Sequence, residues 1–69
     1  MLVNMREFIG KKYILTNKGK IFKIIAWDNL GKIFFIEKGK QNFVFKDEVY
    51  AASDKRKNLE MLKEEFLDD

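Results

Sequence analysis

Lysine follows every glycine in this chain, and these Gly-Lys steps are the first candidates for chemistry. They lie at Gly10-Lys11, Gly19-Lys20, Gly31-Lys32 and Gly39-Lys40. A lysine ammonium group neutralises phosphate, so basic turns are one common form of nucleic-acid contact. None of the steps belongs to the spacing GxxxxGK[ST], which excludes a phosphate-binding loop of that type. Lysines also keep turns soluble and protect strand edges, so both interpretations stay open at this point.

Side chains suited to catalysis are scarce. The chain has no His and no Cys, so the commonest general base, metal ligand and strong nucleophile are missing. The hydroxyls of Ser and Thr reduce to Ser53, at an expected helix cap, and Thr16. Asp47 and Glu48 are adjacent, and neighbouring residues on a strand point to opposite sides. We therefore expect no enzymatic activity, no bound metal and no cofactor.

Length and composition indicate one small folded domain. The 69 residues include 14% aromatic side chains, enough for one tight core, and there is no Cys to form disulfides. We expect a single domain over residues 1–69. The missing Cys, the charged start of the chain and the lack of a long apolar run predict a cytoplasmic protein with no membrane span.

Regularly spaced glycines divide residues 10–50 into short segments that are rich in Ile and Phe. Strands separated by turns at this spacing are typical of a β-meander, sandwich or barrel. The connections carry Gly and Asn, which tolerate the positive φ that tight hairpin turns need. We predict strands at 12–16, 20–27, 32–37 and 42–46.

After the predicted strands the hydrophobic period changes to that of an amphipathic helix. Leu59, Leu62 and Phe66 form an apolar stripe, which predicts a helix over residues 53–67. Ser53 or Asp54 can supply the oxygen that caps its N-terminus. A single helical turn is also predicted near the start of the chain, from Asn4, Met5, Phe8 and Ile9.

Alternation along the strands predicts which side chains face the core. On the second strand the fully apolar set is Phe22, Ile24 and Ala26, which we assign to the core. On the last strand Phe43 and Phe45 point to the same side, and we assign this pair to the core as well. The third strand is apolar on both faces, so we expect it to be central or to lie under the helix.

The run Lys18-Gly19-Lys20, the apolar strand IFKII, a turn and a second apolar strand together resemble the hairpin core of small SH3-like barrels. That group includes the KOW-type modules of transcription and ribosome-associated proteins, and short barrel proteins of phages and mobile elements in low-GC bacteria. The resemblance covers about residues 10–50. It implies a mainly β fold, a small SH3-like antiparallel barrel or meander with a C-terminal amphipathic helix, and a regulatory or mobile-element context. Residues 21–30 lack the further glycine usual in a KOW motif, so no contact residue is transferred from that family.

Charge is distributed unevenly along the chain. Residues 1–50 carry a net charge of +5 and residues 51–69 a net charge of −2. In a meander the first and third turns lie at the same end of the sheet, which would gather four lysines there. We predict nucleic-acid binding, by a non-enzymatic module, at Lys18, Lys20, Lys38 and Lys40.

The alternative function is protein binding or inhibition of a protein partner. Ile21, Ile25 and Trp27 share the outer face of the second strand, where they would form an apolar patch. The stripe of the C-terminal helix, Leu59, Leu62 and Phe66, is the other candidate protein-binding surface. The helix can also cover the Trp27 patch itself, and this alternative stays open.

A homodimer through the C-terminal helix is a further expectation. The helix has basic residues at its start and acidic residues at its end, opposite to the order that its dipole favours. An antiparallel twofold pair would place the basic start of one helix beside the acidic end of the other. The competing arrangement packs the stripe onto the chain's own sheet, over Trp27 and Ile25.

Overall fold

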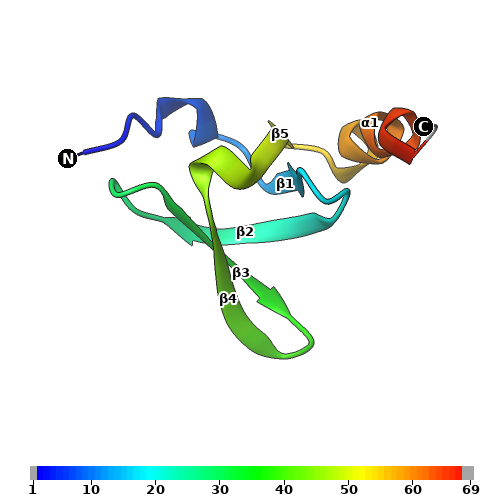
Figure 1. The fold of residues 1–69 in the computed structure, drawn as a ribbon. Coiled ribbons are helices and arrows are strands. Elements are labelled where there is room, and N and C mark those ends of the chain that lie inside the picture. Colours follow the sequence, from blue (N-terminus) through cyan, green and yellow to red (C-terminus); the bar gives the residue numbers. More distant parts are fainter. Residues whose placement is uncertain (1, 68–69) are drawn as a thin grey trace.

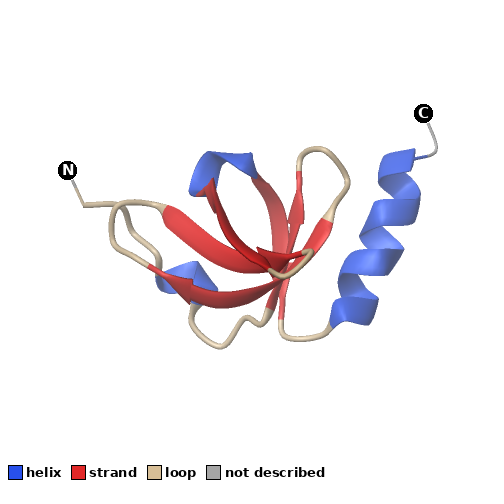
Figure 2. Cartoon of the chain, turned by 90° about the horizontal axis from the view of Figure 1, so that it is seen from below, coloured by secondary structure: helices blue, strands red, loops and turns tan. Residues whose placement is uncertain are grey.

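The computed structural model describes residues 2–67, which form a strongly bent antiparallel sheet with one helix beside it (Figures 1 and 2). The strand order is β4-β3-β2-β1-β5, so β4 and β5 are the two edges of an open sheet. A mainly β fold with a C-terminal helix is therefore confirmed, but the sheet does not close. The strands are β1 (Tyr13–Thr16), β2 (Ile21–Trp27), β3 (Lys32–Glu37), β4 (Lys40–Phe45) and β5 (Val49–Ser53).

Three helical segments accompany the sheet. The 3₁₀ turn η1 (Arg6–Phe8) precedes it, η2 (Lys46–Glu48) links β4 to β5, and α1 (Arg56–Leu67) follows it. The predicted N-terminal turn is confirmed, with Asn4 Oδ1 accepting a hydrogen bond from the Arg6 N–H at 3.0 Å. The predicted C-terminal helix begins later than expected, at Arg56. Ser53 ends β5 instead, and its Oγ accepts hydrogen bonds from Lys55 N–H and Asn58 Nδ2.

The turn between β3 and β4 is the tightest in the sheet. Glu37 pairs with Lys40, which leaves Lys38 and Gly39 as a two-residue loop. Both have positive φ, 53° and 77°, as a type I′ hairpin turn requires. Glycine adopts this conformation without strain, whereas a lysine with its Cβ does so at a cost.

The main core lies inside the bend of the sheet and includes the N-terminal segment. Met5 and Phe8 are buried there with Ile14 and Ile33. Ile9, which the sequence placed with Met5 and Phe8, is instead 67% exposed. Partly buried side chains complete this core: Val3, Phe22, Ile24, Trp27, Val44, Val49 and Ala52.

A β-bulge in β2 reverses part of the predicted facing. Ile24 lies opposite Phe35 but Ala26 lies opposite Phe34, so the register shifts between Ile24 and Ala26. A bulge inserts one extra residue and changes which side chains share a face. Phe22 and Ile24 therefore face the core as predicted, whereas Ala26 is exposed and Trp27 packs against the core.

The facing of β4 is the reverse of the prediction. Val44 lies opposite the fully buried Ile33, and Phe43 lies opposite Phe34. Since directly paired residues share a face, Val44 fills the core position of this edge strand. The assignment of Phe43 and Phe45 to the core was wrong, because they are 42% and 46% exposed.

The helix α1 packs on its own sheet, where it contacts β1, β5 and β2. Leu59 is 1% exposed, and Leu15 of β1, on the face opposite to the core residue Ile14, is also fully buried. The predicted packing of α1 on its own chain is therefore confirmed for Leu59, although over β1 and β5 and not over Trp27. The side chain of Phe66 lies outside the described residues.

Among residues 2–67, no helix has the length and apolar character needed to cross a bilayer.

Candidate nucleic-acid interface

The outer side of the β3–β4 hairpin carries an exposed aromatic cluster. Phe34 and Phe43 are directly paired, with ring centroids 6.1 Å apart and planes inclined by 55°. Phe43 meets Phe45 edge to face, at 5.5 Å and 86°. Three interacting rings on one sheet face, two of them more than 40% exposed, form a surface on which flat groups can stack.

Lys32 adds a positive charge to this cluster. It lies opposite Phe45, and its Nζ lies 4.8 Å from the ring centroid of Phe43, the geometry of a cation–π contact. The Asp28 Oδ1 accepts hydrogen bonds from the backbone N–H groups of Leu30 and Lys32, which fixes the turn before β3. We call Lys32, Phe34, Phe43 and Phe45 the aromatic face.

The four lysines predicted from the sequence are all exposed. Lys18 and Lys20 flank the β1–β2 turn, and Lys38 and Lys40 lie at the tip of the β3–β4 hairpin. By alternation Lys40 shares the face of Asn42 and Val44, opposite to the aromatic face. In Figure 1 both turns lie on the right, with the β3–β4 turn below the other because the sheet bends strongly. The expected single group of four lysines is therefore two pairs on two turns.

A cleft lies between the β1–β2 turn and the edge strand β4. Its volume is about 440 Å³, within the size range of small-ligand pockets, about 300–1,000 Å³. Phe22 and Phe35 stack beneath it with centroids 3.9 Å apart and planes inclined by only 13°. The side chains that surround the cleft combine positive charge, amide groups and aromatic rings: Thr16, Asn17, Lys18, Lys20, Phe22, Phe35, Asn42, Phe43, Val44 and Glu48.

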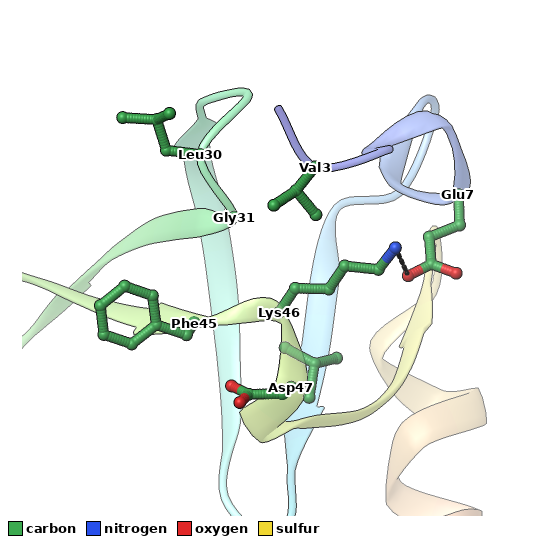
Figure 3. Close-up of a pocket in the computed structure, with 8 residues that line it drawn as sticks. Val3, Glu7, Leu30, Gly31, Phe45, Lys46 and Asp47 are labelled. Carbon is green, nitrogen blue, oxygen red and sulfur yellow. Dashed lines mark ion pairs between the residues drawn. The ribbon is translucent and has the colours of Figure 1, made fainter. Parts of the chain in front are cut away.

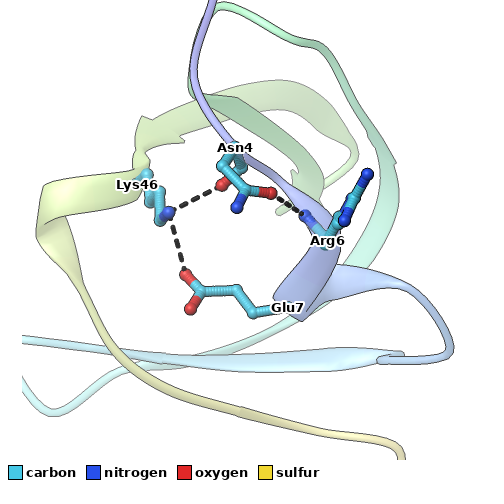
Figure 4. Close-up of polar contacts among 4 residues, drawn as sticks. All are labelled: Asn4, Arg6, Glu7 and Lys46. Carbon is cyan, nitrogen blue, oxygen red and sulfur yellow. Dashed lines mark hydrogen bonds and ion pairs between the residues drawn. The ribbon is translucent and has the colours of Figure 1, made fainter.

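A second groove, of about 550 Å³, lies at the other end of β4, and its charged residues Lys46 and Glu7 make contacts within the chain. Figure 3 shows Phe45 and Leu30 on one side of it and the pair Lys46–Glu7 on the other. Lys46 Nζ lies 3.4 Å from Glu7 Oε1 and donates a 2.7 Å hydrogen bond to the carbonyl of Asn4 (Figure 4). These two contacts engage the Lys46 ammonium group in holding the N-terminal segment against η2.

The residues predicted for protein binding are not brought together. Ile21 is half-buried and Ile25 is exposed, but Trp27 faces the core after the bulge, so the three form no common patch. Of the helical stripe, Leu59 is buried against the chain's own sheet and Leu62 is half-buried. Trp27 and Leu59 are therefore engaged in intramolecular packing, and the homodimer stays a prediction.

The few groups with catalytic potential have structural partners. Thr16 Oγ1 accepts a hydrogen bond from the Lys20 N–H at 3.2 Å, and Ser53 Oγ accepts the two hydrogen bonds before α1. Glu48 Oε2 accepts a hydrogen bond from Phe45 N–H at 2.8 Å. In the part of the chain that the structure describes, no three acidic side chains are grouped as a metal site would need.

Comparison with models of protein families, with curated proteins and with solved structures finds no match for this chain. Sequence reasoning missed the aromatic face because it assigned Phe43 and Phe45 to the core. The signal that was present is Lys32, which alternates with Phe34 along β3 and so marks that side of the strand as the solvent side.

Proposed function

We propose that this chain is a non-enzymatic module that binds single-stranded nucleic acid on the aromatic face. The observation that carries the proposal is the exposed cluster of Phe34, Phe43 and Phe45 with the Lys32 ammonium group over Phe43. Bases of a single strand stack on aromatic rings, and lysines along the path neutralise the phosphates. Double-stranded DNA presents no free base faces, so a single strand fits this surface better.

Lysine placement supports the same function. Lys38 lies in the turn at the end of the hairpin that carries the aromatic face, where a strand leaving the rings would pass. Lys40 follows on the other face of β4, the face of Asn42, which lines the cleft. Lys38 occupies a left-handed position, φ 53°, where Asn or Gly is the residue that the turn prefers. A charged side chain at a strained position is consistent with a binding role for that charge.

The test is the affinity for a fluorescent deoxyuridine octamer, dU8, measured by anisotropy over a range of salt concentrations. Stacking of a base on an aromatic ring contributes about 1–3 kcal/mol, so Phe43→Leu is expected to weaken binding about tenfold. Met61→Leu on α1 is the matched control, because Met61 is exposed but lies away from the aromatic face. Equal affinities for F43L and M61L would refute stacking on this face.

The lysines have a separate readout, the salt dependence. Each phosphate contact contributes about 0.7 to the slope of log K against log salt for a single strand. Replacing Lys38 and Lys40 with Gln is expected to lower that slope by about 1.4 if both contact phosphates. An unchanged slope would mean that these lysines serve only the turn.

A protein partner at the same surface is the second candidate function. Ile36 lies on the outer side of β3 next to Phe34 and is 50% exposed, so the aromatic face continues into an aliphatic one. An apolar protein interface depends little on salt, whereas phosphate binding weakens steeply as salt is added. Capture that persists at high salt and after nuclease treatment would favour the protein partner.

We also propose that the open sheet is an SH3-like fold, the finer form of the mainly β class. Support comes from a four-strand meander whose fifth strand returns to pair with the first strand. A backbone assignment in solution with β1–β5 contacts, such as Ile14 opposite Ala52, is the corresponding measurement.

A further inference from the structure

The cleft between the β1–β2 turn and β4 is a preformed site whose walls are tied together. The Asn17 N–H donates to the Glu48 carbonyl at 2.9 Å, and Asn17 Nδ2 donates to the Asp47 carbonyl at 3.1 Å. These two hydrogen bonds link the turn that carries Lys18 to η2, which carries Glu48. The backbone that carries Lys18 and the backbone that carries Glu48 are thus held together by hydrogen bonds.

The Glu48 carboxylate lies at the edge of this cleft, and hydrogen bonds fix its position. Its Oε2 accepts the Phe45 N–H, and its backbone carbonyl accepts the Asn17 N–H, so both the side chain and the main chain are anchored. The two ion pairs found within residues 2–67, Lys46–Glu7 and Arg56–Glu60, do not involve it. Its other oxygen, Oε1, is therefore available to accept a hydrogen bond from a ligand.

The cleft and the aromatic face meet at one residue. Phe43 carries the central ring of the aromatic cluster on the outer face of β4, and the same residue also lines the cleft, whose residues Asn42 and Val44 lie on the other face. A strand stacked on the aromatic face reaches the cleft by crossing the edge strand β4 at this ring. Lys18 and Lys20 on the opposite wall supply the positive charge that a phosphate at this point requires.

We propose that the cleft holds one base of the bound strand and that Glu48 selects a base with an exocyclic amino group, cytosine in preference to uracil. This inference rests on the single-strand binding proposed above. A carboxylate accepts a hydrogen bond from the N4 amino group of cytosine, whereas uracil presents a carbonyl oxygen at that position and is repelled. Lys18 and Lys20 contact the phosphate of the same nucleotide.

The experiment compares the octamers dC8 and dU8 at pH 8, since the two bases differ at the group that Glu48 would read. We expect the wild-type protein to bind dC8 about five- to tenfold more tightly than dU8. In Glu48→Gln the amide keeps an oxygen for the Phe45 N–H and adds N–H donors. That variant is expected to lose or reverse the preference for dC8.

Asp47→Asn is the matched control for Glu48→Gln. Asp47 is the neighbouring residue in η2 and the substitution removes the same charge, but its side chain lines the other groove. We expect D47N to keep the preference for dC8. A preference that survives E48Q, or that D47N removes equally, would overturn the role of Glu48.

A second measurement covers the case in which E48Q does not fold. Addition of dC8 to the wild-type protein is expected to shift the amide resonances of Asn17, Lys18 and Asn42 more than addition of dU8. Equal affinity for the two octamers, with no shifts at Asn17, Lys18 and Asn42, would overturn the cleft site but leave the aromatic face as a binding surface. Binding of neither octamer would overturn both proposals.

Discussion

The half of the sheet built from β1 and β5 differs from the β3–β4 hairpin in what covers its second face. Over β1 and β5, α1 packs Leu59 to 1% exposure, and Leu15 beneath it is fully buried. Over β3 and β4, the side chains of Phe43 and Phe45 stay more than 40% exposed. In this chain large apolar side chains stabilise the covered half, whereas on the uncovered half they form a surface.

Truncation of Leu59 is expected to lower the free energy of unfolding more than any of the changes that follow. It therefore tests directly whether the covered half of the sheet is the more stabilised one. Leu59→Ala removes a buried side chain that joins α1 to the sheet, which should cost about 2–5 kcal/mol in the free energy of unfolding. Phe45→Ala removes a larger but half-exposed side chain and should cost about 1 kcal/mol or less. Urea denaturation of the two variants measures both.

The order of these two values decides the comparison. If F45A were as destabilising as L59A, the outer rings would be part of the core in solution. The aromatic face would then not be exposed for binding.

Lys46 gives an intermediate effect, because it connects the N-terminal segment to η2. Lys46→Met keeps the aliphatic stem but removes the hydrogen bond to the Asn4 carbonyl and the ion pair with Glu7. The ion pair is largely exposed and contributes little, so most of the expected loss, about 1 kcal/mol, comes from the hydrogen bond.

Glu7→Gln separates the two contributions of Lys46. It removes only the ion pair, and a loss under about 0.5 kcal/mol is expected from thermal or urea unfolding. A loss as large as that of K46M would show that the ion pair, not the hydrogen bond, holds the N-terminal segment.

The smallest effect is a gain in stability at Lys38. Lys38→Asn places at φ 53° a residue that tolerates the left-handed region, so we expect stabilisation by about 0.5–1 kcal/mol. The same substitution removes a charge beside the aromatic face and should lower the salt slope of dU8 binding. Lys40→Gln removes a charge from β4 without relieving the turn, and it should lower the slope without the gain in stability.

Element positions followed closely from the sequence, because alternation and turn residues are local signals. The predicted strand at 32–37 agrees with β3, and those at 12–16 and 20–27 differ from β1 and β2 by one residue at one end. The strand β5 was not located, since Val49–Ser53 is short and contains two alanines, which are weak strand formers.

Side-chain facing was predictable only in part, because it depends on pairing between strands. The bulge after Ile24 leaves no mark in the composition of β2, yet it turns Trp27 into the core. On β4, alternation defined two sets, and the choice between them used polarity, because Asn42 and Lys46 stand in the set with Val44. Polarity favoured Phe43 and Phe45, whereas the pairing of Val44 with Ile33 decided the facing.

The position of β1 between β2 and β5 has a consequence for how the chain folds. The β3–β4 hairpin closes through a two-residue turn, whereas β1 pairs with β5 through residues far apart in the sequence, such as Tyr13 and Ser53. Contacts between residues so distant in sequence form slowly, because a long loop loses entropy before the contacts form. Until β5 is in place β1 is paired only with β2, and the aromatic hairpin is expected to form before the core that supports it.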